Sequence, residues 1–567
     1  MDAAIRKALT AGTERLSAWA DLLDQINVFP VPDADTGRNL VISLSPLRRA
    51  GGPEETVHRL LLAARGNSGN IASRFFSGFL RLSGVADLPR AAGLGRDAAW
   101  AAVADPRPGT MLSVFDALAE SLMARPYNEA DRGLGLIRDL AASVRRTPAL
   151  LPELQGSGVV DSGALGMFIF LEGFFGRLFE ADRPFAPITE RFKGQLRVSP
   201  AFSSRAVGHC ISALVETADG GADPAGVLAG CGESLVTSRE RACLKIHVHA
   251  PDPAAVRKKI GALGRIVDWT EEEMAHGVLA GASPGAGAMH LMTDGAGSIT
   301  RADAAELGIT LLDSYILMGE EALPETRISP PALYRAMAGG ARVSTAQASV
   351  FERHQHYQSA LSRHPRVLYL CVGSAYTGNY GTAMAWKAEH DPEDHFTVMD
   401  TGAASGRLGA AVLAAARFNL RARDPEAVIR FARAAVDRCE EYVFLDRLRY
   451  LAAGGRLSRT GAFFGDALHL KPVVSPTAEG ARKVGVVRDP KGQVAFALER
   501  LRRIRENGPL MFILLEYSDN RTWLEAEVQA GMKRQSPETD ILVRPLSLTS
   551  GAHMGPGAWA AAFMPQI

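Results

Sequence analysis

The sequence predicts a multidomain protein: an all-helical domain, then a small α+β domain, then an α/β domain. The chain has 567 residues, more than one hydrophobic core usually serves. Through the first third, apolar residues recur at helical spacing and strand-like segments are scarce. Over the second half, short apolar runs alternate with helical segments, a pattern typical of a sheet that is at least partly parallel.

Composition and charge exclude several classes of protein. Hydrophobic residues make up 47% of the chain and charged residues 22%, and the net charge is +1, as in ordinary globular proteins. Because no basic run is present, we expect no nucleic-acid partner. We expect no membrane span and a cytoplasmic location, since no stretch approaches the roughly 20 apolar residues of a spanning helix. The five cysteines are too scattered for a disulfide framework.

The helical domain is expected to cover residues 1–193, the α+β domain 194–280 and the α/β domain 288–567, with a linker of small residues at 277–287. Breaks between helices of the first domain are predicted at 28–37, 65–69, 106–109 and 156–163. In the second domain we predict strands at 210–215 and 244–248 and helices at 223–231 and 253–263. In the third we predict strands at 288–292, 309–312, 367–372 and 397–399, and helices at 410–418 and 425–436.

The densest chemistry of the first domain lies in residues 27–39, NVFPVPDADTGRN. Asp33 and Asp35 stand two residues apart ahead of a predicted helix. Alternating carboxylates in a loop can converge on one hard cation such as Mg²⁺, which prefers a few carboxylates together with phosphate oxygens and water. The alternative is that one of these carboxylates caps the helix that follows.

Three further segments fall at breaks between helices. Residues 64–70, ARGNSGN, lead into an apolar helix, and free amides at a helix start suit an anion. The other two are PRPGTM at 106–111 and VVDSGALG at 159–166. Each segment taken alone could equally be an ordinary loop.

Taken together and in this order, the four segments resemble the DhaL kinase domain of the fatty acid kinases. The resemblance implies an antiparallel helical barrel whose loops at one end hold two Mg²⁺ ions and ATP. Asp33 and Asp35 would be the metal ligands, with Asn27 in the metal shell. Ala34 stands where glycine is usual in the family, and it is tolerable only if its φ stays below zero.

The same resemblance implies a nucleotide site and a reaction. Residues that would bind the nucleotide are Asn39, Asn67, Ser68, Gly69, Thr110, Met111, Asp161 and Gly163. Asp33, Asp35 and Thr110 would act in catalysis, by positioning and by electrostatic stabilisation. A fatty acid carboxylate would be the phosphoryl acceptor. Since carboxyl groups titrate near pH ~4, that acceptor is already ionised at neutral pH and needs no general base.

A second metal site is predicted in the middle domain, at KIHVH, residues 245–249. His247 and His249 would point to one face of a strand, and Cys210 lies on an earlier predicted strand. Two imidazoles and a thiolate suit tetrahedral Zn²⁺ with one position left open. The alternative is a solvent-facing histidine pair beside a buried thiol. The segment resembles the middle domain of the fatty acid kinases, in which a histidine pair and an upstream cysteine bind zinc.

Five segments of the third domain resemble, in order, the motifs of the DegV family: residues 292–296, 343–349, 372–380, 454–458 and 551–557. The resemblance implies an enclosed long-chain fatty acid whose carboxylate is held by hydroxyl groups. Residues that would contact or lie near the carboxylate are Thr345, Thr377, Gly378 and His553, and Arg456 would guide docking or stabilise the exposed carboxylate. Gly295, Ala346 and Ala348 depart from the family pattern, and the lost hydroxyl at Ala346 weakens the expected grip.

Three functions stay open at this point. The favoured one is a fatty acid kinase with Mg²⁺, ATP and zinc. A kinase of a small hydroxy-ketone such as dihydroxyacetone is disfavoured by the VPDADTG form of the metal loop. A lipid-binding regulatory protein with a silent kinase domain is disfavoured by intact Asp33, Asp35 and Ser68. Expected partners are a long-chain fatty acid, a separate fatty-acid carrier or an acyltransferase, and a second copy in a homodimer. The third domain would be a loaded carrier rather than a docking domain.

Overall fold

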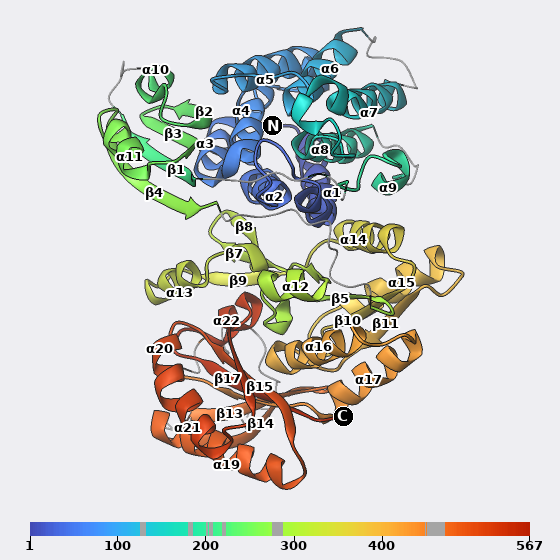
Figure 1. The fold of residues 1–567 in the computed structure, drawn as a ribbon, viewed down its shortest axis with the longest axis vertical. Coiled ribbons are helices and arrows are strands. Elements are labelled where there is room, and N and C mark those ends of the chain that lie inside the picture. The colour runs from blue at the N-terminus through green and yellow to red at the C-terminus, as the bar shows by residue number, and fades with distance from the viewer. Residues whose placement is uncertain are drawn as a thin grey trace. The chain divides into compact units, whose positions relative to one another are not determined.

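The structure, a computed structural model, describes residues 1–124, 132–179, 185–199, 202, 208–217, 223–274, 287–447, 450 and 471–567. The chain divides into two compact units, Met1–Ala282 and Ser283–Ile567 (Figure 1). Within these ranges no helix combines the length and the apolar character needed to cross a membrane.

The first part of the N-terminal unit is helical, as predicted. Its helices are α1 (Ala3–Gln25), α2 (Thr36–Leu44), α3 (Pro53–Ala63), α4 (Gly66–Phe79), α5 (Leu88–Ala102), α6 (Met111–Ala124), α7 (Arg132–Leu150), α8 (Ser162–Leu178) and α9 (Ile188–Arg191). Helix α8 is apolar on nearly every side and buried over most of its length, so it forms the centre of the helical core. It packs against α1, where buried Arg15 donates from Nε to Glu172 Oε2 at 2.9 Å.

The second part of the N-terminal unit is an antiparallel sheet with the strand order β2-β3-β1-β4. Its elements are β1 (His209–Glu216), α10 (Pro224–Leu228), β2 (Glu233–Glu240), β3 (Cys243–Ala250), α11 (Pro253–Gly261) and β4 (Arg265–Glu273). The predicted strands at 210–215 and 244–248 are confirmed. The edge strands β2 and β4 were not predicted, because a half-exposed edge strand carries a weaker apolar pattern.

The sheet lies beside the helices of the same unit, with β2 along α3, α4 and α5 (Figure 1). A β-bridge joins Val103, just past α5, to Val236 in β2. The amide of Ala104 donates to the carbonyl of Leu235 at 3.1 Å. The helical part and the sheet therefore pack as one unit, which places residues of β1 and β3 next to the helical loops.

The C-terminal unit contains a parallel sheet with the order β11-β10-β5-β6, which confirms the predicted parallel arrangement. A second, mainly antiparallel sheet has the order β14-β13-β12-β17-β15-β16, and a small sheet has the order β8-β7-β9. Strand β17 in the second sheet was not predicted, because its alanine run resembles a helix.

The bounds of these elements follow in chain order. They are β5 (His290–Asp294), α12 (Arg301–Leu307), β6 (Ile309–Leu312), β7 (Tyr315–Met318), β8 (Glu321–Pro324), α13 (Pro330–Ala338), β9 (Val343–Ala346), α14 (Val350–Arg363), β10 (Val367–Cys371), α15 (Asn379–His390), β11 (Phe396–Asp400), α16 (Ser405–Asn419), α17 (Pro425–Arg438), β12 (Glu440–Phe444), β13 (Lys471–Thr477), β14 (Gly480–Val487), α19 (Pro490–Glu506), β15 (Leu510–Tyr517), α20 (Arg521–Trp523), α21 (Ala530–Gln535), β16 (Asp540–Pro545), α22 (Leu548–Met554) and β17 (Trp559–Pro565). The alanine-rich helix α16 shares one apolar core with strands of both large sheets.

Candidate functional site

A pocket in the N-terminal unit gathers residues from three separate parts of the sequence. Its lining comes from the loop before α2, the start of α4, and strands β1 and β3 of the sheet in the same unit. The lining residues are Asn27, Pro30, Val31, Asp33, Asp35, Thr36, Gly66, Asn67, Ser68, Cys210, His247 and His249. The two predicted metal-binding motifs and the predicted phosphate loop therefore face one pocket.

The carboxylates of the metal loop oppose each other at this pocket. The side chain of Asn27 donates from Nδ2 to Asp33 Oδ1 at 2.6 Å, and Ser162 Oγ donates to Asn27 Oδ1 at 3.2 Å. Burial, and then the charge of Asp35, raise the pKa of Asp33 to about 8. A cation between the two carboxylates would relieve this repulsion, so the donor set fits a hard divalent ion.

The alternative role for these carboxylates, capping of α2, is not what the structure shows. Asp35 precedes α2, yet its side chain makes no capping hydrogen bond. The cap comes from Asp24 in α1, whose Oδ1 accepts from the amides of Gly37 at 2.6 Å and Arg38 at 3.1 Å. Neither Asp33 nor Asp35 is therefore needed to cap α2, and both can serve as cation ligands.

Ala34 does not keep φ below zero, so the premise that alanine is tolerable here only under that condition is wrong. Ala34 adopts φ +54°, the left-handed region in which Cβ crowds the following carbonyl oxygen. The conformation turns the chain between Asp33 and Asp35, and the alanine tolerates it at a cost of roughly 1 kcal/mol.

Within the break predicted at 65–69, residues 66–69 instead form the first turn of α4. Asn67 and Ser68 line the pocket, and Asn67 Oδ1 is buried without a hydrogen-bond partner among the described residues. Asn39 and Gly69 instead hold α4 against α2. A Cβ on Gly66 would lie 2.2 Å from Asn39 Nδ2, and one on Gly69 would lie 2.0 Å from Ser43 Oγ.

The start of α8 lies next to Ser68. A Cβ on Gly163 would lie 2.8 Å from Met111 Cε and 3.5 Å from Ser68 Oγ, so these three predicted residues meet. Asp161 caps α8, accepting from the amide of Ala164 at 2.7 Å, and burial raises its pKa to about 7. Thr110 lies at the start of α6, where its hydroxyl donates to the Arg107 carbonyl at 2.9 Å. No contact between Thr110 and the pocket is found in the described part of the chain.

The predicted zinc ligands form a close triad. The ligand atoms of Cys210, His247 and His249 all lie within 4.8 Å of one another, because Cys210 pairs with His249 across β1 and β3. The two Nε2 atoms approach to 3.3 Å. On the far side of one ring, His247 Nδ1 lies 3.1 Å from Ser212 Oγ, a contact that helps to orient the imidazole.

The protonation state of the two histidines favours metal binding, whereas burial raises the pKa of the Cys210 thiol to about 12. Burial lowers the pKa of His249 to about 4 and that of His247 well below its usual value. Both imidazoles are therefore neutral and can offer a lone pair. One sulfur and two nitrogen donors fit Zn²⁺ with one further position for water or substrate.

In the C-terminal unit, the structure joins two of the predicted carboxylate-binding residues. Thr345 Oγ1, in β9, lies 3.1 Å from His553 Nε2 in α22. Gly378 also approaches the segment that follows β9, since a Cβ on Gly378 would lie 3.8 Å from Gln347 Oε1. Thr377 Oγ1 accepts from the Asn379 amide at 3.3 Å and so begins α15. Arg456 lies outside the described residues.

A buried network missed by sequence reasoning supports the Thr377 loop. Asp294, at the end of β5, accepts from Arg353 Nη1 at 2.6 Å, Tyr369 OH at 2.9 Å and Asn379 Nδ2 at 3.0 Å. It also accepts from the Val372 amide at 2.8 Å. Asp294 and Arg353 are almost fully buried. The departure at Gly295 has a packing reason, because a Cβ there would lie 2.7 Å from Thr326 Cγ2.

Comparison with known proteins identifies both halves of the chain. Residues 30–176 match the DAK2 domain, and residues 288–566 match the DegV family of uncharacterised proteins. The chain thus combines an N-terminal region that matches the DAK2 domain with a C-terminal region that matches the DegV family.

Particular relatives can be named. Protein YloV of Bacillus subtilis is 30% identical over 299 residues, which cover 47% of this chain and 54% of that protein. An uncharacterized protein of Staphylococcus epidermidis is 29% identical over 297 residues, 46% of this chain and 53% of its own length. The chain thus spans about half the length of the curated relatives it matches.

Solved structures of DegV proteins align with about half of this chain. A DegV family protein from Thermus thermophilus, described as binding fatty acid, is 24% identical, with a TM-score of 0.44. It covers 49% of this chain and 99% of its own. DegV from Bacillus subtilis, described as a fatty acid binding protein, is 20% identical with the same coverages and a TM-score of 0.45.

Proposed function

We propose that the protein is an Mg·ATP-dependent phosphotransferase that converts a long-chain fatty acid to its acyl phosphate, with the acid held by the DegV-family domain. The observation that carries the proposal is the single pocket lined by Asp33, Asp35, Ser68 and the triad of Cys210, His247 and His249. It combines cation-binding carboxylates with a helix start that suits phosphate.

Each group of residues at the pocket has a defined task. Asp33 and Asp35, with Asn27, would hold Mg²⁺, which when bound neutralises the charge of the ATP phosphates. The amides at the start of α4, with Asn67 and Ser68, bind phosphate oxygens. Met111 and Gly163 pack closely beside Ser68, since any side chain at Gly163 would meet Met111, and we propose that they flank the nucleotide.

The acceptor is a carboxylate, and the pocket is consistent with this. A carboxylate is ionised at neutral pH, so the chain's residues have only to orient it in line with the γ-phosphoryl group and exclude water. Cys210, His247 and His249 would hold Zn²⁺, whose open position supplies a Lewis acid for a bound oxygen. The pocket therefore offers hard oxygen ligands from the two carboxylates and softer ligands from the neutral imidazoles and the sulfur.

The DegV-family domain holds the acid by its head group. Thr345 and His553 form a hydrogen-bonding pair, and a carboxylate accepting from both would be fixed by charge-assisted hydrogen bonds. An apolar cluster contributed by β7, α13 and α22 includes Ile316, Leu333 and Met337. Because β7 pairs with β9 and α22 carries His553, this cluster adjoins the pair, and we propose that the acyl chain packs against it.

The test is acyl-phosphate formation from Mg·ATP and a panel of long-chain fatty acids, trapped with hydroxylamine. Wild type is compared with Asp35→Asn and with Asp97→Asn, a matched change at an exposed carboxylate in α5. We expect product from wild type and Asp97→Asn, and a loss of about a hundredfold or more in Asp35→Asn. Product from dihydroxyacetone instead would contradict the acceptor. Lipid binding with no nucleotide binding would contradict the kinase.

A further inference from the structure

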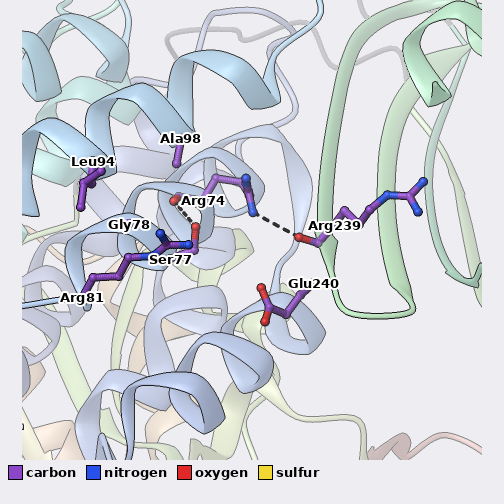
Figure 2. A pocket seen from close by; sticks show the side chains of 8 residues that line it. All are labelled: Arg74, Ser77, Gly78, Arg81, Leu94, Ala98, Arg239 and Glu240. Carbon is purple, nitrogen blue, oxygen red and sulfur yellow. Dashed lines mark hydrogen bonds between the residues drawn. The ribbon is translucent and has the colours of Figure 1, made fainter. Parts of the chain in front are cut away.

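A cavity of about 270 Å³ lies at the opposite end of α4 from the candidate kinase pocket, between α4, α5 and β2. Its lining combines cationic, small and apolar side chains: Arg74, Ser77, Gly78, Arg81, Leu94, Ala98, Arg239 and Glu240 (Figure 2). The functional assignment above uses none of these residues.

Two guanidinium groups are available to this cavity. Arg239 turns its side chain away (Figure 2) and donates from Nη1 to Thr217 Oγ1 at 3.0 Å. Arg74 and Arg81 remain. Arg74 donates from Nη1 to the carbonyl of Arg239 at 3.3 Å, while its Nε is buried without a hydrogen-bond partner in the described residues.

Positive charge at this cavity is only partly balanced. Neither Arg74 nor Arg81 forms an ion pair among the residues described, and Glu240 is the carboxylate that faces them (Figure 2). Burial, and then the charge of Arg81, lower the pKa of Arg74, while Glu240 opposes this. A partly buried cation with an unused donor is costly unless an anion or water completes its shell.

We propose that this cavity binds a small anion that carries a phosphate group. Arginine matches the geometry of phosphate oxygens, gives up its hydration easily and can donate two parallel hydrogen bonds. Leu94 and Ala98 form an apolar wall on one side. The volume accommodates a phosphate with a small organic group and lies just below the usual range for drug-sized ligands.

The position of the cavity links it to the kinase pocket. Helix α4 has 14 residues, so it extends about 20 Å from Gly66 at the kinase pocket to the cavity. Strand β2, which contributes Arg239, pairs with β3. In this pairing Val236 of β2 lies opposite His247 of β3. An anion held by Arg74 therefore acts on the helix that bears Ser68, and Arg74 itself donates to β2 of the sheet that bears His247. By linkage, anion and nucleotide affinities change together.

The experiment is calorimetric titration of the full chain with inorganic phosphate, at constant ionic strength, without nucleotide or Mg²⁺. Arg74→Gln and Arg81→Gln are compared with Arg90→Gln, a matched change at an exposed arginine of α5 outside the cavity. We expect saturable binding to wild type and Arg90→Gln, and binding about tenfold weaker or more in the other two. Arg74 is partly buried, so its replacement could disturb folding. Arg81 is exposed, so its replacement tests phosphate binding without that risk.

Glu240→Gln provides a test in the opposite direction. Removing the carboxylate that competes for the two arginines should tighten phosphate binding several-fold, which a purely structural role for Glu240 would not produce. Wild-type affinity in both Arg74→Gln and Arg81→Gln, or absence of saturable binding in wild type, would overturn the proposal. Citrate binding as tightly as pyrophosphate would overturn the assignment to phosphate.

Coupling has its own readout, the dissociation constant of ADP with and without phosphate. We expect phosphate to shift this constant in wild type and Arg90→Gln, and the shift to disappear in Arg81→Gln. A shift that persists in Arg81→Gln would come from phosphate at the kinase pocket and would contradict the coupling, as would an unchanged constant in wild type.

Discussion

Ala34 adopts a left-handed backbone conformation between the two metal-loop carboxylates. Replacing it by glycine removes the clash of Cβ with the backbone, although glycine loses more entropy on folding. We expect Ala34→Gly to raise the free energy of unfolding by roughly 0.5–1 kcal/mol, measured by urea denaturation. Ala63→Gly in helix α3 is the matched control and should lower it by a similar amount. Equal loss of stability in both variants would show that Ala34 is unstrained.

Cys210 is the residue on which the zinc assignment depends. We expect the full chain to bind about one zinc ion, and Cys210→Ser to lose most of it because a serine hydroxyl is a much poorer ligand than a thiolate. Cys231→Ser, at a cysteine outside the triad, should retain the metal. Elemental analysis after dialysis against a weak chelator measures both. Full zinc occupancy in Cys210→Ser would assign the metal to other ligands.

Residue patterns predicted some of this site and missed the rest for a physical reason. The two-residue spacing of Asp33 and Asp35, and of His247 and His249, is local, so alternation and loop chemistry suffice to find each pair. That both pairs line one pocket depends on packing of the sheet against the helices, which no local pattern records. The same holds for Asp24, which caps α2 from another helix.

At the scale of elements, the start of α16 contacts a buried pair of acidic residues, Glu441 in β12 and Glu516 in β15. Its first amides, at Gly406 and Arg407, donate to Glu441 at 3.1 and 2.8 Å, and Ser405 Oγ donates to Glu516 at 3.2 Å. Burial raises the pKa of Glu441 to about 7. Burial, and then Glu441, raise the pKa of Glu516 well above its usual value. The pair therefore retains protons that the unfolded chain releases.

Linkage turns this pair into a pH prediction. Because the folded pKa values are raised, the contribution of this pair to stability is fully present below about pH 4.5 and is lost as the pH rises toward and beyond 7. Glu516→Gln removes one of the two retained protons while keeping a donor for Glu441. We expect its free energy of unfolding to fall less steeply than that of wild type between pH 5 and 8. The free energy of unfolding of Glu527→Gln, a change at an exposed carboxylate, should vary with pH as in wild type. The same pH dependence of this free energy in all three proteins would contradict the prediction.

Elements were predicted unevenly for related reasons. The parallel strands β5, β6 and β10 are short apolar runs and were found. Strand β17 contains three consecutive alanines, whose helix preference is overridden by burial between β12 and β15. Tertiary context also explains Gly295, whose missing side chain leaves space for Thr326.

At the scale of the whole molecule, the proposed nucleotide and fatty acid sites lie in different units. Thr345→Val keeps the side-chain shape and removes the hydroxyl that pairs with His553. We expect it to weaken fatty acid binding about tenfold or more and to leave nucleotide affinity unchanged. Thr345→Ser should restore binding, and exposed Thr522→Val should behave as wild type. Fluorescent fatty acid titration and ADP calorimetry measure the two affinities.

If the proposed function holds, covalent linkage of the units predicts that a chain phosphorylates the acid it carries. Joining carrier and kinase raises the effective concentration of one for the other, so delivery within a chain should outcompete delivery between chains. A mixture of Asp35→Asn, with an intact carrier, and Thr345→Val, with an intact kinase, should then form no more acyl phosphate than Thr345→Val alone, at a fatty acid concentration well below saturation. Recovery toward wild-type rates in the mixture would show instead that one chain supplies another, and the rate would then rise with total protein concentration.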